Sequence, residues 1–343
     1  MRFVRKLCAW IIGIVLFVAG FLKLMDPVGA GLVVTEYFKF FSVGFLAGIA
    51  KPVAVAMALF ETILGAAVIT GVWRKVVAAI AAVVLGGFTI LTFVLWIANP
   101  EMDCGCFGEA IHLTHAQSLL KNVVLCVLWV GAYIPFSKML PTPKVKYVGF
   151  ALASLSVVAF AIWSLRSVPM IDFTPYAPGT ELMGDEYIPD AQVLSFSDAS
   201  GEYADSLAVH GKVVVFSAYD PSRLSDAKCE AVSAAVENAA LAGCTPVVLV
   251  AGPADAAGPL SGLPVYSCDR KTLMTFNRSN GGASYLDDGE IIAKWPVRSL
   301  PGSEELSALT GMDPVEAMVE SNNPPRLKVQ AFLLYVFAVM LLL

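Results

Sequence analysis

The chain has 343 residues, of which 57% are hydrophobic and 15% are charged, and its formal net charge is −5. Soluble domains contain roughly half apolar and a quarter charged residues, so this composition excludes an ordinary soluble protein and indicates a membrane protein. No basic cluster suits a nucleic-acid partner. Seven cysteines in a chain of this length do not form a disulfide framework.

Long apolar runs predict the membrane spans in chain order. Each run has close to the ~20 residues that cross about 30 Å of hydrocarbon. They cover residues 7–25, 52–71, 76–98, 115–136 and 147–165, with a loop expected at 26–51. Thr114 and Gln117 have the spacing of a capping box that would begin the fourth span. The first run shows no small-residue cleavage pattern, so we expect a retained span and not a signal peptide.

Lysine and arginine in the connections predict the orientation. Two lie on the side of the loop at 26–51, namely Lys39 and Lys51. Eight fall on the other side: Arg2, Arg5, Lys6, Arg74, Lys75, Lys138, Lys144 and Lys146. The positive-inside rule therefore places the N-terminus in the cytoplasm. The connection at 99–114 and everything after residue 165 would lie outside, in a bacterial periplasm or its equivalent.

The composition changes after residue 166. Residues 167–184 are rich in proline and polar groups and are typical of a linker. Residues 185–319 are enough for an independent core, and they are expected to form strands at 212–217, 245–251 and 264–268, a helix at 222–242 and a hairpin at 283–295. This order indicates an α/β sandwich with a mixed sheet. Residues 326–343 end in an apolar run from 329, which we expect to be a short sixth span.

The connection after the third span concentrates the candidate chemistry. Cys104 and Cys106 are separated only by Gly105, and Phe107 and Gly108 follow. A disulfide across one residue requires backbone strain, which glycine relieves in part, and a strained disulfide is more oxidising. The acids Glu101, Asp103 and Glu109 oppose thiolate formation, and the loop contains no lysine or arginine that would lower a thiol pKa.

Three interpretations of this loop remain open. The first is thiol–disulfide exchange by Cys104 and Cys106. The second is a metal site in which His112 and His115 join the two cysteines, although this spacing departs from common zinc motifs. The third is a tight turn with inert thiols or a structural disulfide. We favour exchange and expect no metal.

A second candidate feature lies within the spans. Glu61 is about 13 Å into the second span at 1.5 Å per residue, and a carboxylate at that depth is costly unless it is paired or protonated. Lys23, near the outer end of the first span, is long enough to reach it. The two residues would form a structural pair, handle protons or contact a quinone, or Glu61 would face a polar cavity.

Three segments of the first 136 residues carry a family pattern: residues 19–27 with Lys23, Phe60 and Glu61 with Gly71 at the end of that span, and Cys104-Gly105-Cys106-Phe107-Gly108. With them, residues 1–136 resemble the DoxX/MauE family of four-helix membrane proteins. Members of the MauE-like branch have been linked to periplasmic thiol–disulfide chemistry, and some DoxX relatives to quinone-linked complexes. The resemblance implies a redox role for the two cysteines and a quinone as a candidate electron acceptor.

Two further segments, residues 205–216 and 281–290, match the entry to the first core strand and the run into the hairpin of thioredoxin-like domains of the TlpA or peroxiredoxin kind. Residues 185–319 resemble that fold. However, residues 218–224 contain no cysteine where a Cys-x-x-Cys would open the helix, and Gly282 stands near the expected cis-proline. We therefore expect a fold without its redox centre. Asp220 and Arg223, at the place of the missing motif, are candidate partner-binding residues.

The sequence thus predicts an α-helical membrane bundle with an α/β thioredoxin-like periplasmic domain, in a bacterial inner membrane. Residues 1–136 would form the four-helix core, 137–166 a connection with the fifth span, 167–184 the linker, 185–319 the outer domain and 326–343 the last span. We expect thiol–disulfide exchange with a periplasmic thiol protein. The alternative is a non-catalytic scaffold or assembly subunit of a membrane complex, whose outer domain binds a partner protein.

Overall fold

The computed structural model describes residues 2–135, 141–184, 190–253 and 258–342. The chain forms two compact units, one built from Met1–Leu165 with Gln330–Leu343 and the other from Arg166–Val329. Among the sequence expectations, the end of the fourth span at 136, Lys138, the start of the outer domain at 185 and residue 343 lie outside the described residues.

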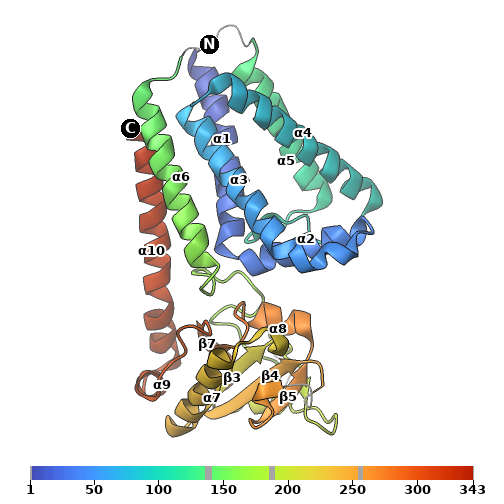
Figure 1. The fold of residues 1–343 in the computed structure, drawn as a ribbon, viewed down its shortest axis with the longest axis vertical. Helices are drawn as coiled ribbons and strands as arrows, with labels where there is room; N and C mark the ends of the chain where they lie inside the picture. Colours follow the sequence, from blue (N-terminus) through green and yellow to red (C-terminus); the bar gives the residue numbers. More distant parts are fainter. Residues whose placement is uncertain (1, 136–140, 185–189, 254–257, 343) are drawn as a thin grey trace. The chain divides into compact units, whose positions relative to one another are not determined.

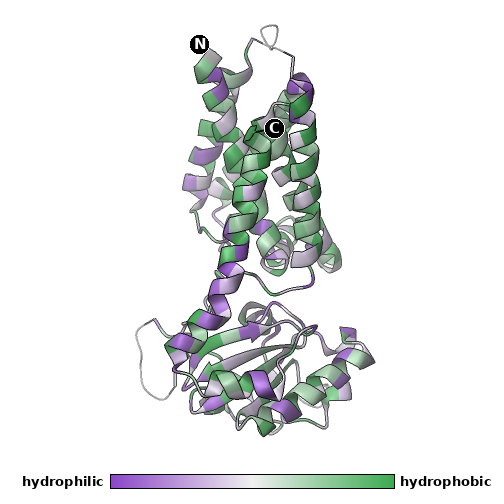
Figure 2. Ribbon diagram, turned by 90° about the vertical axis from the view of Figure 1, so that its left-hand side faces the viewer, coloured by the Kyte–Doolittle hydropathy of each residue, from purple (hydrophilic) through white to green (hydrophobic). Residues whose placement is uncertain are grey.

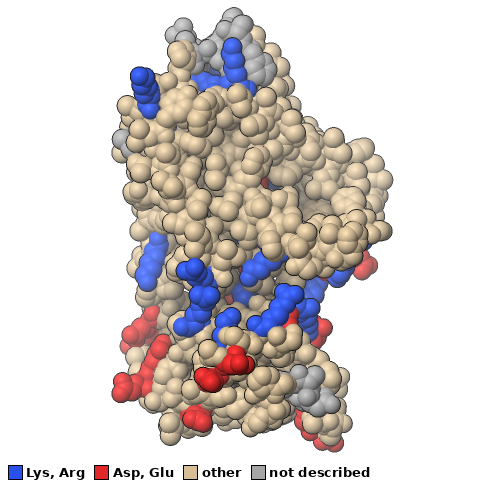
Figure 3. Space-filling model, in the orientation of Figure 1, with Lys and Arg blue, Asp and Glu red and all other residues tan. Residues whose placement is uncertain are grey.

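The first unit is a bundle of apolar helices (Figure 1). Within the described ranges, six helices are long and apolar enough to cross a membrane, as the sequence predicted. Their bounds are α1 Arg2–Met25, α3 Ala50–Thr70, α4 Arg74–Ala98, α5 His115–Tyr133, α6 Lys144–Ser164 and α10 Pro314–Leu342. Hydrophobic residues dominate these helices in Figure 2, and the flanks of this unit carry almost no charged side chains on the face shown in Figure 3.

Residues 26–51 were expected to be a loop, and this prediction is wrong. They form α2, Pro27–Phe40, followed by a 3₁₀ helix, Gly44–Ile49. Asp26 caps α2 by accepting a hydrogen bond from the Gly29 backbone at 2.9 Å, and Pro27 occupies the first helical turn. Aspartate before proline is a helix start signal. The helix was not predicted in spite of this signal, because it is short and buries only its first residues.

Small residues let α1 and α3 approach closely. A Cβ atom at Gly65 would lie 2.4 Å from the Phe17 backbone nitrogen, and one at Gly20 would lie 2.6 Å from the Thr62 backbone nitrogen. Distances under 3.0 Å cannot be accommodated without backbone movement, so glycine is required at both positions. This close packing brings Lys23 of α1 beside Glu61 of α3.

Side-chain hydrogen bonds define the two ends of the helical unit. At one end Arg5 donates to Ala132 O, Thr142 donates to Gly71 O, and Lys146 donates to Leu341 O near the end of α10. At the other end Ser164, the last residue of α6, donates to Leu24 O at 2.6 Å. The Lys/Arg-rich connections therefore share one end, and the chain leaves the bundle at the opposite end.

The second unit is built on one mixed sheet. In its described residues the sheet has six strands in the order β2-β5-β4-β3-β6-β7. β3, β4 and β5 are parallel, whereas β6, β7 and the edge strand β2 are antiparallel to their neighbours. The strand bounds are β2 Phe196–Ser197, β3 Lys212–Ala218, β4 Thr245–Ala251, β5 Val265–Cys268, β6 Gly282–Asp287 and β7 Glu290–Trp295. The predicted α/β architecture and hairpin are confirmed.

Alternation along β3 creates two hydrophobic layers, one on each face of the sheet. Val214 and Phe216 pack with α7, Asp226–Leu241, and α9, Ser303–Thr310. Val213 and Val215 pack with α8, Arg270–Phe276, and with the segment before β2. Burying both faces explains why β3 has a continuous apolar sequence.

The expected linker at 167–184 is instead part of the α/β unit. Tyr176 and Leu182 are buried in its core, and the Leu182 backbone donates to Gly289 O at 2.9 Å. Asp172 forms an ion pair with Lys294 of β7 at 2.8 Å. The proline-rich composition indicated a free linker, but these long-range contacts attach the segment to the sheet edge.

The C-terminal helix is also longer than predicted. The sequence indicated a short span after Pro324 and Pro325, but α10 runs continuously through both prolines. Its first half belongs to the α/β unit, where Asn322 donates to Ile292 O at 3.1 Å. The tertiary contacts of this polar half compensate for the helix-breaking tendency of the prolines. The apolar half from residue 330 belongs to the helical unit.

The Asp172–Lys294 pair gives a stability prediction. Burial disfavours the carboxylate, but the charge of the Lys294 ammonium and the hydrogen bonds from Lys294 and Thr174 together outweigh burial and hold the pKa of Asp172 below its usual range. Asp172→Asn leaves Lys294 buried without its charge partner and is expected to cost about 3–5 kcal/mol. Because a depressed pKa stabilises the fold only where the unfolded carboxyl is ionised, this difference from the wild type should be full near pH 7 and shrink below pH ~4.

The measurement is thermal unfolding of the full-length protein in detergent, followed across that pH range. Asp172→Leu combined with Lys294→Met is the control, since replacing both partners removes the uncompensated charge and should recover most of the stability. A single variant as stable as the wild type at pH 7 would show that the pair does not hold the segment.

Candidate functional site

The CxC loop, residues 99–114, leaves α4 through Asn99, which adopts a left-handed conformation with φ 43°. The loop contains a short strand, β1 Cys106–Glu109, and ends where α5 begins. There Thr114 accepts a hydrogen bond from the Gln117 backbone at 3.2 Å while the Gln117 side chain accepts one from the Thr114 backbone at 3.0 Å. The predicted capping box is confirmed, and it fixes the first turns of α5 against the loop.

The two loop cysteines lie side by side and differ in exposure. Their Sγ atoms are 3.0 Å apart and are not bonded to each other. Cys104 is 4% exposed, whereas Cys106 is half-buried. All seven cysteines belong to the described part of the chain, and all are free. A disulfide sulfur pair is about 2.05 Å apart, so only a small movement would join these two.

Helix α2, which the sequence analysis missed, holds the loop in place. Tyr37 Oη donates to the Cys104 carbonyl oxygen at 2.7 Å. Gly105 has φ +61°, and a Cβ atom there would lie 2.3 Å from Val33 Cγ1. Burial raises the pKa of Tyr37, as do the two neighbouring cysteines, so its hydroxyl stays protonated and remains a donor. Glycine is therefore needed at position 105 for both conformation and space.

Two lysines from the helices lie near Cys106. Lys23 is paired with Glu61 at 2.6 Å, and the Gly108 backbone packs against it, because a Cβ atom there would be 3.7 Å from Lys23 Cα. Lys121 of α5 places its Nζ 4.8 Å from the centre of the Phe107 ring. Lys23 was expected to pair with Glu61, but its place near Cys106 and that of Lys121 were not predicted, because both lysines lie outside the loop. A lysine seven residues into an apolar span was the signal that could have revealed Lys121.

This environment gives the two thiols opposite acidities. A hydrogen bond from Cys104, assisted by Lys121, Ser118 and Lys23, outweighs burial and lowers the pKa of Cys106 to about 5. The same hydrogen bond, together with burial, raises the pKa of Cys104. The pair therefore favours a proton on the buried Cys104 and negative charge on Cys106. The loop acids, which were expected to oppose a thiolate, are not among the causes that set this pKa, and the cations that lower it come from helices outside the loop.

The histidines of the loop do not join the cysteines. His112 Nδ1 lies 3.1 Å from Asp103 Oδ2 at the surface, and His115 Nε2 lies 3.1 Å from the Pro100 carbonyl oxygen. Among the residues that the structure describes, no group of three or more histidine, cysteine, aspartate or glutamate side chains is placed to hold a metal ion. The alternative ligand set of Cys104, Cys106, His112 and His115 is therefore not assembled.

The candidate partner-binding residues Asp220 and Arg223 follow β3. Arg223 Nε lies 3.2 Å from Asp220 Oδ2, and Arg270 reaches the same oxygen at 3.4 Å. The Asp220 backbone exchanges two hydrogen bonds with the Asn280 side chain, at 2.9 and 2.7 Å. Arg223 is largely exposed. The segment is thus tied to the turn before β6 and presents one cation at the surface.

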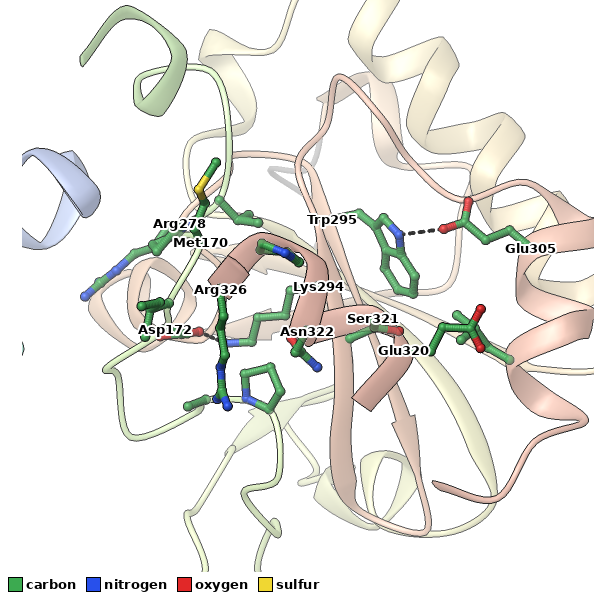
Figure 4. Close-up of a pocket in the computed structure, with 18 of the residues that line it drawn as sticks. Met170, Asp172, Arg278, Lys294, Trp295, Glu305, Glu320, Ser321, Asn322 and Arg326 are labelled. Atoms are coloured by element: carbon green, nitrogen blue, oxygen red, sulfur yellow. Dashed lines mark hydrogen bonds and ion pairs between the residues drawn. The ribbon is translucent and has the colours of Figure 1, made fainter. Parts of the chain in front are cut away.

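The α/β unit also contains a cavity of about 380 Å³ that no sequence motif indicated (Figure 4). The Asp172–Lys294 pair lies on its wall, and Trp295 Nε1 donates to Glu305 Oε1 at 3.0 Å. Its lining mixes these polar groups with methionine, proline and alanine side chains and contains no cysteine. It is distinct from the cysteine pair in chemistry and in chain location.

The helices and the mixed sheet define a multi-pass membrane protein with an attached α/β domain. Residues 1–135, which include the cysteine pair and the Lys23–Glu61 pair, match the family model described as methylamine utilisation protein MauE. The chain matched no curated protein and no solved structure in these comparisons. The match supports the predicted membrane family for this part of the chain, and it does not extend to the α/β unit.

The acidity of Cys106 can be measured by alkylation with iodoacetamide, which reacts with thiolates. In the reduced full-length protein the rate at Cys106 should rise with pH around a midpoint of about 5, since below that pH the thiolate is protonated. Cys104→Ala should raise this midpoint, because it removes the main hydrogen-bond donor. Peptide mapping by mass spectrometry separates Cys106 from the other cysteines. A midpoint of about 8.5 in both proteins, as in free cysteine, would contradict this site geometry.

Gly105 provides a test of the loop conformation. Gly105→Ala places a Cβ atom against Val33 and costs roughly 1 kcal/mol for the left-handed conformation before that clash is counted. We expect a lower unfolding temperature and loss of low-pH alkylation at Cys106. Gly86→Ala is the matched control, because a Cβ atom there meets no atom within 4 Å. Equal behaviour of the two variants would show that the loop does not need glycine.

Proposed function

We propose that this protein exchanges disulfides with a thiol protein outside the cytoplasm, through Cys104 and Cys106. The observation that carries the proposal is the asymmetric pair: two sulfurs 3.0 Å apart, one in the buried Cys104 and the other in the half-buried Cys106, whose pKa is lowered. Exchange needs a thiolate that a partner can reach and a second thiol beside it. An inert turn or a purely structural pair needs neither property.

The difference in exposure between Cys104 and Cys106 supports the following order of exchange steps. The Cys106 thiolate attacks one sulfur of a partner disulfide, and the other partner sulfur leaves as a thiolate and is protonated. Cys104 then loses its proton and attacks Cys106 Sγ, which forms the Cys104–Cys106 disulfide and releases the first partner sulfur as a thiol. The partner gains two electrons and two protons. In the reverse direction the Cys104–Cys106 disulfide oxidises a partner dithiol.

Location outside the cytoplasm is supported by charge and by chemistry. The positively charged connections of the bundle, with Arg5, Arg74 and Lys146, are at the end opposite the CxC loop, and positive loops favour the cytoplasm. Disulfides persist in a compartment such as the bacterial periplasm. The chain leaves α6 at the loop end, so the α/β unit would lie on the same side of a bacterial inner membrane.

The strand arrangement supports a thioredoxin-like fold for the α/β unit. Parallel β3 and β4, antiparallel β6 and β7, and helices after β3 and before β6 follow the order of that fold. Its cysteines, Cys229, Cys244 and Cys268, are buried, and residues 219–224 contain none. We infer that this unit binds the partner or a membrane-complex subunit, with Asp220 and Arg223 as candidate contacts, while the loop carries out the exchange.

A quinone remains the candidate acceptor of electrons from the reduced pair. The cavity of the α/β unit is lined by neither Cys104 nor Cys106, so it does not place a quinone at the pair. The proposed exchange steps therefore do not involve a quinone.

Oxidised glutathione is a defined probe for this proposal. In purified full-length Cys104→Ser, the Cys106 thiolate should take up one glutathione and retain it, because the resolving thiol is absent. The wild type should instead end as an intramolecular disulfide without bound glutathione. Cys106→Ser should take up little at Cys104, which is buried. Intact-mass measurement and peptide mapping read all three outcomes.

Absence of glutathione on Cys106 in Cys104→Ser, in a protein that is folded and reduced, would exclude exchange and favour the non-catalytic scaffold or assembly subunit. A wild type whose two cysteines stay fully reduced at every glutathione ratio would do the same.

A further inference from the structure

Three charged side chains from three different helices lie beside the segment that follows Cys106, where Lys23 packs against the Gly108 backbone and Lys121 lies over the Phe107 ring. Lys23 of α1 and Glu61 of α3 form an ion pair at 2.6 Å, in which Glu61 is 5% exposed. Lys121 of α5 is half-buried over the Phe107 ring. Two ammonium groups and one carboxylate leave one positive charge in this cluster, which we call the Lys–Glu–Lys cluster.

One thiolate at Cys106 balances that charge. Uncompensated charge away from water is costly, and the interaction between charges strengthens as the local dielectric constant falls. In the reduced pair the thiolate neutralises the cluster. In the oxidised pair both sulfurs are neutral, so a thiolate no longer balances the net positive charge of the cluster. The cluster therefore favours the reduced pair over the disulfide.

Ser118 adds a second observation that points to the same sulfur. It is fully buried, and its Oγ has no hydrogen-bond partner among the described residues. Buried hydroxyl groups without a partner are rare and need an explanation. Ser118 lies one turn before Lys121 on α5, close enough to both sulfurs to lower the pKa of each. A small rotation would let its hydroxyl donate to the Cys106 thiolate.

We propose that Lys23, Glu61 and Lys121 are positioning residues that set the redox poise of the Cys104–Cys106 pair, with one net positive charge that makes its disulfide oxidising. The proposal rests on the exchange function above and goes beyond it, because it assigns the direction of transfer. A disulfide whose reduced form is stabilised is a strong oxidant. The protein would therefore accept electrons from partner dithiols, and the partner would leave with a new disulfide.

The signs of the charges distinguish this role from a structural ion pair. Removing a cation should weaken the oxidant, and removing the carboxylate should strengthen it. If Lys23 and Glu61 served only to fix the register of α1 and α3, replacing either one would destabilise the bundle and leave the redox equilibrium unchanged. The two hypotheses thus differ in a quantity that can be measured on folded protein.

The experiment equilibrates purified full-length protein with mixtures of reduced and oxidised glutathione at pH 7 and quantifies the Cys104–Cys106 disulfide by alkylation and mass spectrometry. Lys121→Met should shift the equilibrium about tenfold toward the disulfide, and Glu61→Gln about tenfold toward the dithiol, as expected for a charge within several ångströms at an effective dielectric constant near 20. Ser118→Ala should shift it toward the disulfide, because a donor to the thiolate is lost.

Matched variants control for folding and for general charge effects. Lys121→Arg keeps the positive charge and should retain the wild-type equilibrium, so comparing it with Lys121→Met isolates charge even if Glu61→Gln fails to fold. Lys39→Met removes an exposed lysine from α2 and should leave the equilibrium unchanged. The pH midpoint at which the ultraviolet absorbance of the thiolate appears should rise by about one unit in Lys121→Met and stay unchanged in Lys121→Arg.

Two results would overturn the proposal. Lys121→Met and Lys121→Arg could behave alike, or Lys121→Met and Glu61→Gln could shift the equilibrium in the same direction. If Cys104→Ser still takes up glutathione, either result contradicts the role of the Lys–Glu–Lys cluster in setting the redox equilibrium. The exchange function itself would still stand. Failure of Cys104→Ser to take up glutathione removes both, so the two failures are distinguishable.

Discussion

The buried ion pair between Lys23 and Glu61 is the interaction on which the site depends. A carboxylate that is 5% exposed inside an apolar helix requires a partner, and α1 provides one only because glycine lets the two helices approach. The pair then lies directly under the loop, where the Gly108 backbone contacts Lys23. The need to pair the buried Glu61 carboxylate thus determines how closely α1 and α3 pack, what the loop rests on and which charges lie near the sulfurs.

The fold makes two chemically identical thiols different. Helix α2 covers the Cys104 side of the loop through Tyr37 and Val33, while Lys121 approaches from α5 on the side of Cys106. The hydrogen bond from Cys104 to Cys106 is the first cause of the difference between the two pKa values, and burial of Cys104 adds to it, while Lys121 acts on both thiols. A loop of two cysteines and a glycine has no such asymmetry by itself. It arises from the three helices that meet there.

The predictions that depended on local patterns succeeded, and those that depended on long-range contacts did not. The apolar spans, the capping box at Thr114, the hairpin at Asp287 to Gly289 and the Lys23–Glu61 pair follow from composition, spacing or depth along one helix. The linker at 167–184 has a loop-like composition and is held by backbone hydrogen bonds to β7 and the hairpin turn, which no local pattern reveals. The cations near Cys106 lie in α1 and α5, outside the loop, so a count of charges within the loop leaves them out.

The chain passes between the helical unit and the α/β unit at two places. α6 ends at Ser164 beside Leu24, and Phe332 of α10 packs against Phe21 and Phe160. Both connections to the α/β unit therefore leave the bundle at the end that carries Cys104 and Cys106. In the proposed exchange, the α/β unit would contribute recognition and not electrons, because its own cysteines are buried and residues 219–224 contain no thiol.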